Sequence, residues 1–452
     1  MTDEPTRPAN SSGDAAGPPA PEAGVVEICR DLIRIDTTNF GDDDGPGERR
    51  AAEYVATKLS DAGLEPTLYE PEPGRTTVAA RWEGSDPSAD PLLVHGHLDV
   101  VPAMAADWSV DPFAGEIRDG CLWGRGAVDM KDFDAMVLSV LAARTRGGRP
   151  PRRPIVLVFT ADEEAGGRKG AHWLVDQHPK VLEGCTEAIG EVGGFSLTVR
   201  DDLRLYLIQT AEKGMAWMRL RASGTAGHGS MRNDDNAVTE LADAVARIGR
   251  HEFPPRITPT AKAFLAELSD ALGADLDPEA ADVQATLARF GTIARMIGAT
   301  LRNTANPTML DAGYKANVIP GEATATVDGR FVPGGEEEFL ASIDELIGDR
   351  VTREMINFDT APETEFSGGV VEAIRTSLVA EDPAAKAVPY LTSAGTDAKA
   401  WTRLGIRCFG FAPLRLPPDL DFAGMFHGVD ERVPTESLEF GARVLDRFLD
   451  IA

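Results

Sequence analysis

Hydrophobic and polar positions alternate with two different periods in the first part of the chain. Apolar residues recur at helical spacing in segments 25–35 and 48–64, and the second segment closes on Gly63, a residue type that favours helix C-termini. Short apolar runs at 76–84, 91–101 and 153–164 predict strands, and 130–148 predicts the helix between the last two. This alternation predicts an α/β fold with a mostly parallel sheet flanked by helices.

The pattern changes near residue 205. Segments 205–230 and 314–334 each predict a pair of antiparallel strands with one exposed face, and between them lie an amphipathic helix at 236–250 and a proline-bounded, mostly helical stretch at 254–310. The α/β pattern returns at 336–351 and runs to the C-terminus.

We therefore expect one large α/β domain in two parts, interrupted by a small α+β domain. The expected boundaries are 1–23 for a disordered tail, 24–207 and 336–452 for the large domain, and 208–335 for the inserted domain. The tail is rich in Pro, Ala, Ser and acidic residues, and it has neither the basic start nor the apolar core of a signal peptide.

Composition narrows the class of partner. The formal net charge of −28 argues against nucleic acid or an anionic membrane, because both are polyanions. No stretch approaches the length of a membrane span. The four cysteines are scattered without a CxxC pair, which favours the reducing cytoplasm.

The stretch VLVFTADEEAGG, residues 156–167, places three consecutive carboxylates after an apolar strand. Asp162, Glu163 and Glu164 repel one another and lose solvation on burial, so a fold that collects them normally holds a cation nearby. The alternative is an acidic loop in an acidic protein.

A second stretch, LLVHGHLDVV, combines histidine with carboxylate. The two-residue period of a strand places His95, His97 and Asp99 on one side, provided that the strand reaches that far. An imidazole can bind a metal through one nitrogen while an acid holds the other nitrogen. The alternative is a pair of structural histidines.

Three further residues are candidates only in combination. Asp129 lies in a glycine-rich turn before a helix, where the alternative is a helix N-cap; Glu191 precedes two glycines, where the alternative is a solvated acid; His427 lies in a late loop, where the alternative is a surface histidine. Together the five stretches supply six or seven N and O ligands at the expected ends of parallel strands, where open α/β sheets place their sites.

In these motifs the chain resembles the co-catalytic zinc hydrolases of metallopeptidase family 20, which include aminoacylase, acetylornithine deacetylase, succinyl-diaminopimelate desuccinylase, glutamate carboxypeptidase and carnosine-type dipeptidases. The resemblance runs from about residue 24 to the end. Its motifs occur in the order of the family: HGHLDVVP, GRGAVDMK, TADEEAGG, GEVGG, GTAGHGS, NVIPGEATATVDGRFVPG, SAGTDA and FHGVDE.

The resemblance implies a site with two zinc ions, for which cobalt or manganese could substitute. His97 and Glu191 would hold one ion, Glu164 and His427 the other, and Asp129 would bridge them. The resemblance also implies a cis peptide after Asp129, an orienting role for Asp99 toward His97, and no metal contact for His95.

The same resemblance gives Glu163 the role of general base. Two zinc ions about 3.5 to 4 Å apart lower the pKa of a bridging water, and Glu163 would take its proton and later return it to the leaving amine. Asp162 has no implied role, and a surface or turn function is expected for it.

The inserted domain corresponds to the lid and dimerisation domain of the family. His228 would reach the active site of a partner subunit and stabilise the oxyanion, while four further residues would contact the substrate: Arg330, Asn317, Gly395 and Thr396. For Arg330 a salt bridge within the sheet is the alternative. The match of Gly395 and Thr396 is the weaker part of the resemblance.

The expected function is therefore zinc-dependent hydrolysis of an amide bond in a small peptide, of the dipeptidase or carboxypeptidase kind, in a cytoplasmic homodimer. The alternative is an N-acyl-amino-acid deacylase. A relative that keeps the fold but only binds its ligand would have lost the base or a metal ligand, whereas every one of those positions is filled here.

Overall fold

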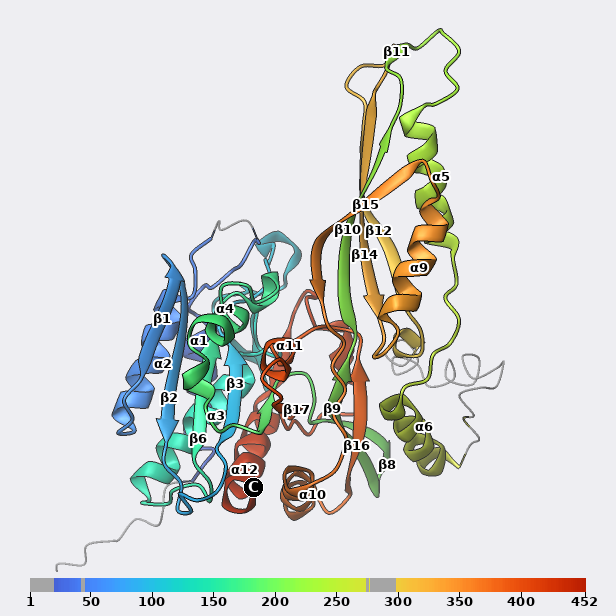
Figure 1. The fold of residues 1–452 in the computed structure, drawn as a ribbon. Coiled ribbons are helices and arrows are strands. Elements are labelled where there is room, and N and C mark those ends of the chain that lie inside the picture. Colours follow the sequence, from blue (N-terminus) through green and yellow to red (C-terminus); the bar gives the residue numbers. More distant parts are fainter. Residues whose placement is uncertain (1–19, 42–44, 274–275, 277–297) are drawn as a thin grey trace, which may run out of the picture.

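The computed structural model describes residues 20–452 except 42–44, 274–275 and 277–297. It has a large helix-flanked sheet and a second, smaller sheet that extends away from the first (Figure 1). Most of the expected tail at 1–23 lies outside the described residues, and so does part of the expected helical stretch at 254–310.

The large sheet has the strand order β1-β2-β6-β3-β7-β17-β9-β16, with β8 beside β9. Its four central strands, β6, β3, β7 and β17, run parallel, whereas β1 and β2 pair antiparallel at one edge. The sheet is therefore mostly parallel, as predicted. The strands are Thr67–Glu72 (β1), Arg75–Trp82 (β2), Leu92–His97 (β3), Ile155–Thr160 (β6), Glu187–Gly190 (β7), Phe195–Arg200 (β8), Leu203–Glu212 (β9), Ala385–Thr392 (β16) and Arg407–Gly410 (β17).

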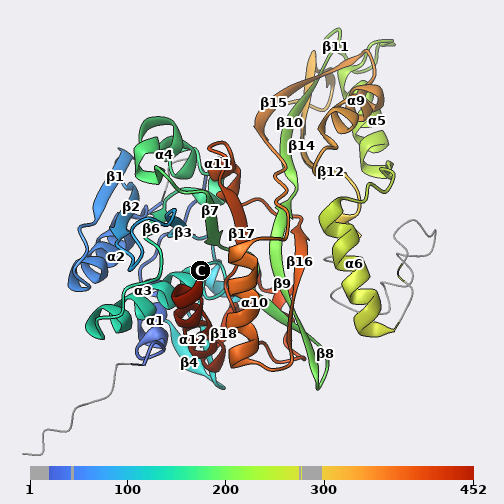
Figure 2. The same cartoon turned by 60° about the horizontal axis from the view of Figure 1, so that its bottom comes forward.

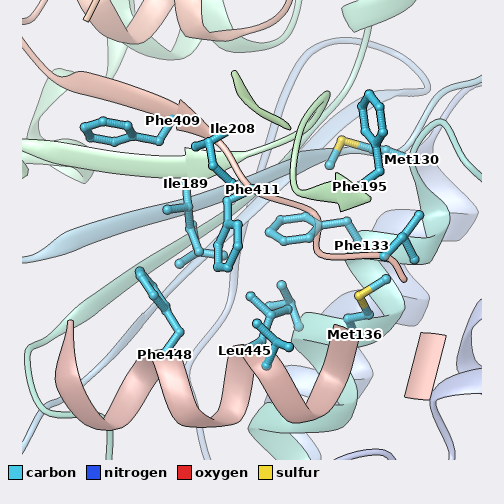
Figure 3. Close-up of a cluster of buried hydrophobic side chains, with 14 of the residues drawn as sticks. Met130, Phe133, Met136, Ile189, Phe195, Ile208, Phe409, Phe411, Leu445 and Phe448 are labelled. Carbon is cyan, nitrogen blue, oxygen red and sulfur yellow. The ribbon is translucent and has the colours of Figure 1, made fainter. Parts of the chain in front are cut away.

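Helices cover both faces of this sheet, which explains why every residue of β3 and β6 is buried. One face packs on α1 (Val25–Ile33), α2 (Arg49–Asp61), α3 (Lys131–Arg146), α10 (Gly369–Glu381) and α12 (Thr435–Ile451), and Figure 3 shows Phe133 and Met136 of α3 beside Leu445 and Phe448 of α12 in that core. The other face packs on α4 (Ala171–Gln177) and α11 (Ala398–Thr402).

The small sheet is antiparallel, with the order β12-β14-β10-β15. Its strands are Thr304–Ala312 (β12), Glu322–Phe331 (β14), Gly214–Ser223 (β10) and Val351–Asp359 (β15), and α5 (Ala237–Arg250) and α9 (Glu336–Ile347) share its hydrophobic core. At its far end the short strands β11 (Gly227–His228) and β13 (Val318–Ile319) pair with each other. A third sheet lies near the C-terminus and consists of three short strands: Glu116–Arg118 (β4), Cys121–Trp123 (β5) and Arg432–Pro434 (β18).

The structure corrects both expected boundaries of the inserted domain. Strand β9 continues in the large sheet to Glu212, so the first crossing lies at Lys213 rather than at 207. Segment 336–359 was expected in the large domain, but α9 packs in the core of the small sheet and β15 pairs with β10 along nearly its whole length. A helix followed by a strand carries no sequence signal for the sheet that it joins.

Helix α6 (Pro259–Leu272) also departs from the expected domain assignment, in the opposite direction. It lies within the expected inserted domain, yet it packs against β16 and β9 of the large sheet, with Phe264 and Leu268 in the large core (Figure 2).

All four cysteines are free. Within the described part of the chain, no helix combines the length and the apolar character needed to cross a membrane.

Candidate metal centre and active site

The candidate ligands gather where the central parallel strands end. His97 is the last residue of β3, Glu163 and Glu164 open the 3-10 turn that follows β6, and Glu191 directly follows β7. Because β3, β6 and β7 are parallel neighbours, their carboxyl ends meet at one edge of the sheet. Two loops complete the group, one with Asp129 before α3 and one with His427 before β18.

The distances fit two adjacent metal positions. His97 Nε2 lies 3.1 Å from Asp129 Oδ1 and 3.3 Å from Glu191 Oε2. His427 Nε2 lies 3.5 Å from Asp129 Oδ2 and 3.2 Å from Glu164 Oε2. Two ligands that each bind a tetrahedral zinc ion at about 2.1 Å lie about 3.4 Å apart. The two oxygens of Asp129 therefore face one histidine each.

The buried carboxylates of the site favour the binding of cations. Burial, and then the Glu191 carboxylate, raise the pKa of Glu163 well above its usual value, and burial with the neighbouring carboxylates raises the pKa of Glu164 and of Glu191 to about 7. Oε1 of Glu191 is buried and has no hydrogen-bond partner among the described residues. Burial disfavours the charged form of His97, but the surrounding acids outweigh it and raise its pKa well above the usual value. A divalent ion would relieve this excess of negative charge.

Glu163 lies close enough to count as a further possible ligand. Its Oε2 is 4.0 Å from His97 Nε2, and one ligand atom each of His97, Glu163 and Glu191 lie within 4.8 Å of one another. A second group of the same size comprises His97, Asp129 and Glu164. The described residues thus form a possible metal site, in which Glu163 lies near enough to act either as a ligand or as the general base.

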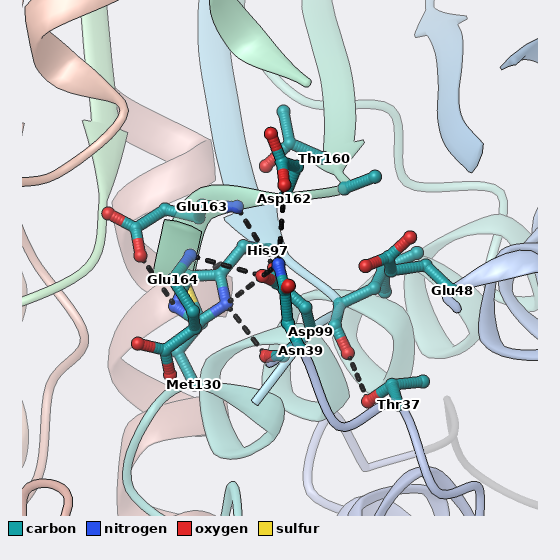
Figure 4. A network of polar contacts seen from close by, with 12 residues as sticks. Thr37, Asn39, Glu48, His97, Asp99, Met130, Thr160, Asp162, Glu163 and Glu164 are labelled. Atoms are coloured by element: carbon teal, nitrogen blue, oxygen red, sulfur yellow. Dashed lines mark hydrogen bonds and ion pairs between the residues drawn. The ribbon is translucent and has the colours of Figure 1, made fainter. Parts of the chain in front are cut away.

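Asp99 holds the site together from behind (Figure 4). Its carboxylate accepts hydrogen bonds from the peptide N–H groups of Glu163 and Glu164 at 3.1 and 3.0 Å, and its Oδ1 lies 3.6 Å from His97 Nδ1. The backbone oxygen of Asp99 is nearer that nitrogen, at 3.0 Å. Asp99 thus fixes both the imidazole and the turn that carries the two glutamates.

Two supporting groups were missed from the sequence. Asn39 donates to Asp99 at 2.9 Å, and no local pattern marks a residue 60 positions away. Glu431 accepts hydrogen bonds from Arg125 at 2.8 Å and from the peptide N–H of Val128 at 2.7 Å, so it shapes the turn before Asp129. Glu431 stands within the FHGVDE motif, which offered a signal for it. The Asp129–Met130 peptide is cis, as the resemblance implied.

Two other expectations are settled by burial. His95 is buried beside Trp401, with ring centroids 5.7 Å apart, and it belongs to neither of the two ligand groups. Asp162 is buried, so of the two expected roles the surface role is wrong and the turn role holds: its carboxylate accepts a hydrogen bond from the peptide N–H of Lys169 at 2.9 Å in the turn after β6.

Four of the five candidate ligands, Asp129, Glu164, Glu191 and His427, line a cavity of about 750 Å³ between the two sheets. Arg330 of β14 faces this cavity, and so do Gly395 and Thr396. Arg330 also pairs with Asp328 at 2.7 Å, so the salt bridge that was its alternative is present together with its exposure to the cavity.

The structure does not bring His228 or Asn317 to this cavity. Both are exposed at the far end of the small sheet, where the peptide N–H of Gly229 donates to the backbone oxygen of Asn317. Figure 1 shows β11, which ends at His228, at the end of the molecule farthest from the large sheet.

Histidines and carboxylates around a deep cavity at the ends of parallel strands define a candidate metal-dependent hydrolase. A sequence profile described as Peptidase family M20/M25/M40 matches residues 93–451, and the chain belongs to this family. It is accordingly a hydrolase of C–N amide bonds.

Similar proteins span nearly the whole chain. The N-fatty-acyl-amino acid synthase/hydrolase PM20D1 of Xenopus tropicalis is 29% identical and covers 92% of this chain and 83% of its own, and aminoacylase-1 of Sus scrofa is 25% identical and covers 90% of each. The M20 family metallo-carboxypeptidase Sso-CP2 from Sulfolobus solfataricus has the same fold, with a TM-score of 0.70 at 17% identity over 94% of this chain and 98% of its own.

Proposed function

We propose that the protein is a dinuclear zinc hydrolase that cleaves the amide bond between an acyl group and a leaving amino acid. The observation that carries the proposal is the position of Asp129, whose two carboxylate oxygens face His97 and His427 at 3.1 and 3.5 Å. One carboxylate between two histidines is the arrangement that a bridging ligand requires.

The ligand sets divide around that carboxylate. His97 and Glu191 would hold one ion, Glu164 and His427 the other, and Asp129 both, with cobalt or manganese as possible substitutes. Two divalent ions, when bound, supply Lewis acidity and lower the pKa of water toward neutrality.

Glu163 is the base in this proposal. It lines the cavity beside the ligand cluster, and its raised pKa suits a group that takes a proton from the attacking water and then donates it to the leaving amine. Asp99 positions Glu163 by accepting its peptide N–H.

Arg330 would bind the carboxylate of the leaving amino acid. Arg330 lines the cavity from the small sheet; Nε and Nη2 of its guanidinium donate to Asp328, and Nη1 would donate to the substrate carboxylate. Asn317 would meet the substrate from a partner subunit, and Gly395 and Thr396 would line its pocket. This leaving group is common to a dipeptide or carboxypeptidase substrate, our first choice, and to an N-acyl amino acid. The second substrate is favoured by the names of two relatives, the N-fatty-acyl-amino acid synthase/hydrolase and aminoacylase-1.

A homodimer completes the proposal. His228 is exposed at the far end of the small sheet, so it can serve catalysis only in another subunit. Strand β12 is an edge strand of that sheet and exposes Met309 and Leu310 at 68% and 62%, a surface that a second copy would cover. The four free thiols fit a cytoplasmic enzyme.

The substrate test compares dipeptides with N-acyl amino acids, each as the free acid and as the C-terminal amide, with zinc, cobalt and manganese in turn. We expect turnover of the free acids, and we expect Arg330→Ala to lower kcat/KM for them by about 10- to 100-fold, because a hydrogen-bonded charge pair is lost. The amides should be poor substrates for both proteins. Equal rates on acid and amide would contradict the role of Arg330, and no turnover of either substrate class would contradict the proposed function.

A further inference from the structure

A second cavity, of about 90 Å³, adjoins the active-site cavity on the side of the large sheet. Its walls come from β8, β9, β16, α6 and the loop 416–423, and they include Leu197, Leu207, Phe264, Leu416 and Leu420. Nothing in the proposed chemistry uses these residues.

The two cavities adjoin at three shared lining residues. Phe195, Tyr390 and Ala423 line both of them, and the rings of Phe195 and Tyr390 stand edge to face with centroids 6.3 Å apart. A group that extends from the metal side into the second cavity would have to pass these three residues.

The lining of the second cavity is mostly apolar. Among the described residues that form it, none carries a charge; its side-chain hydroxyls belong to Ser196, Thr198 and Tyr390, and that of Ser196 accepts a hydrogen bond from the peptide N–H of Leu416 at 2.9 Å. A mostly apolar cavity with a few polar groups suits an aliphatic group.

We propose that this cavity is the subsite for an aliphatic chain on the acyl side of the scissile amide. The inference rests on the proposed function, which directs the leaving amino acid toward Arg330 on the small sheet. The acyl group then lies on the other side of the scissile bond and is free to run toward Phe195 and Tyr390 on β8 and β16 of the large sheet.

The volume of the second cavity determines how many methylene groups it can hold, and therefore how far kcat/KM can rise with chain length. A methylene takes up about as much space as a water molecule in the liquid, about 30 Å³, so the cavity accepts on the order of three methylene groups. Each buried methylene raises kcat/KM by about fourfold. Among N-acyl derivatives of one amino acid, kcat/KM should rise by on the order of 50-fold over about three successive carbons and then level off.

The experiment uses the metal-loaded full chain and two substrate series. One series lengthens the acyl chain of a fixed amino acid from acetyl to dodecanoyl, and the other lengthens the amino-acid side chain of a fixed N-acetyl group. Leu420 lines only the second cavity and is half-buried, so Leu420→Trp should fill the cavity and Leu420→Ala should enlarge it. Leu68 of β1 is a half-buried leucine at the distant sheet edge, and Leu68→Trp is the matched control.

We expect the acyl series to show the rise in the native chain and in Leu68→Trp, and Leu420→Trp to abolish it while the acetyl substrate keeps its rate. Leu420→Ala should move the plateau to longer chains, which tests the proposal even if the tryptophan variant fails to fold. A flat acyl series would overturn the proposal, as would a rise that Leu420→Trp leaves intact or a rise confined to the side-chain series.

Calorimetric binding of acetate and octanoate separates this inference from the proposed function. If no substrate is turned over, the proposed function fails, and the cavity is still decided by whether octanoate binds more tightly than acetate in the native chain but not in Leu420→Trp. Equal affinities in the native chain would overturn the subsite.

Discussion

At the scale of single residues, the two adjacent glutamates after β6 diverge in position. Glu164 Oε2 lies 3.2 Å from His427 Nε2, whereas Glu163 Oε2 lies 4.0 Å from His97 Nε2, and both peptide N–H groups are fixed by Asp99. Consecutive side chains on a tight turn point in different directions. One can therefore serve as a ligand while its neighbour keeps a proton-accepting oxygen free for the substrate.

The first prediction concerns Glu163. Glu163→Gln keeps the shape of the side chain but removes its basicity, so turnover should fall by about 10²- to 10⁴-fold with little change in KM. Steady-state kinetics on the best substrate of the panel provides the measurement. A variant that keeps more than a tenth of the native turnover would exclude Glu163 as the base.

At the scale of elements, the crossing between the two sheets lies at a buried lysine. Lys213 stands between β9 and β10, its side chain is inaccessible to solvent, and its Nζ donates to Thr304 Oγ1 at 3.2 Å. Burial, and then the nearby positive charge of Arg330, lower the pKa of Lys213 from 10.5 to about 7. The crossing thus carries a charge that costs stability at neutral and acidic pH.

The second prediction follows from the sign of this shift. Between about pH 7 and pH 10.5 the unfolded chain binds the proton and the folded chain does not, so the stability of the folded state rises with pH by up to about 1.4 kcal/mol per unit. Lys213→Met removes the titration. The apparent Tm of Lys213→Met should exceed that of the native chain most at pH 6 to 7, and the difference should shrink by pH 9.5. A difference independent of pH would contradict the buried charge.

The sequence predicted the helices and strands better than it predicted which of them pair or pack together. The apolar runs of β3 and β6 identified buried parallel strands, and the residues that follow them gave the candidate ligands. Segment 336–359 was assigned to the wrong sheet, because the alternation of apolar and polar residues describes a strand but not its neighbour. Asn39 was missed for a related reason: its contact with Asp99 exists only after the chain has folded.

At the scale of the whole molecule, the position of His228 raises the question of a dimer. The described chain places this histidine beyond the small sheet, exposed and without contact to the cavity. Its Nδ1 lies 2.9 Å from the hydroxyl of Ser230, so the other ring nitrogen can face a partner.

The third prediction uses two inactive variants. If His228 donates to the oxyanion in a partner subunit, His228→Ala should lose about 10²- to 10³-fold in turnover. Mixing it with Glu163→Ala should restore up to about a quarter of native turnover, because half of the randomly formed dimers are mixed and each has one intact site of two. Subunit exchange is verified with tagged chains. No recovery after verified exchange, or full activity in a stable monomer, would remove His228 from catalysis.

The central claim is that five residues hold two metal ions and that Glu163 is not among them. The most direct measurement is the number of metal ions bound per chain, by elemental mass spectrometry after equilibration with zinc, in the native protein, Glu163→Gln and Asp129→Ala. We predict two ions in the native chain and in Glu163→Gln, and fewer in Asp129→Ala, which lacks the carboxylate that lies within 3.5 Å of both histidines. A single ion in the native chain, or the loss of metal from Glu163→Gln, would contradict the account.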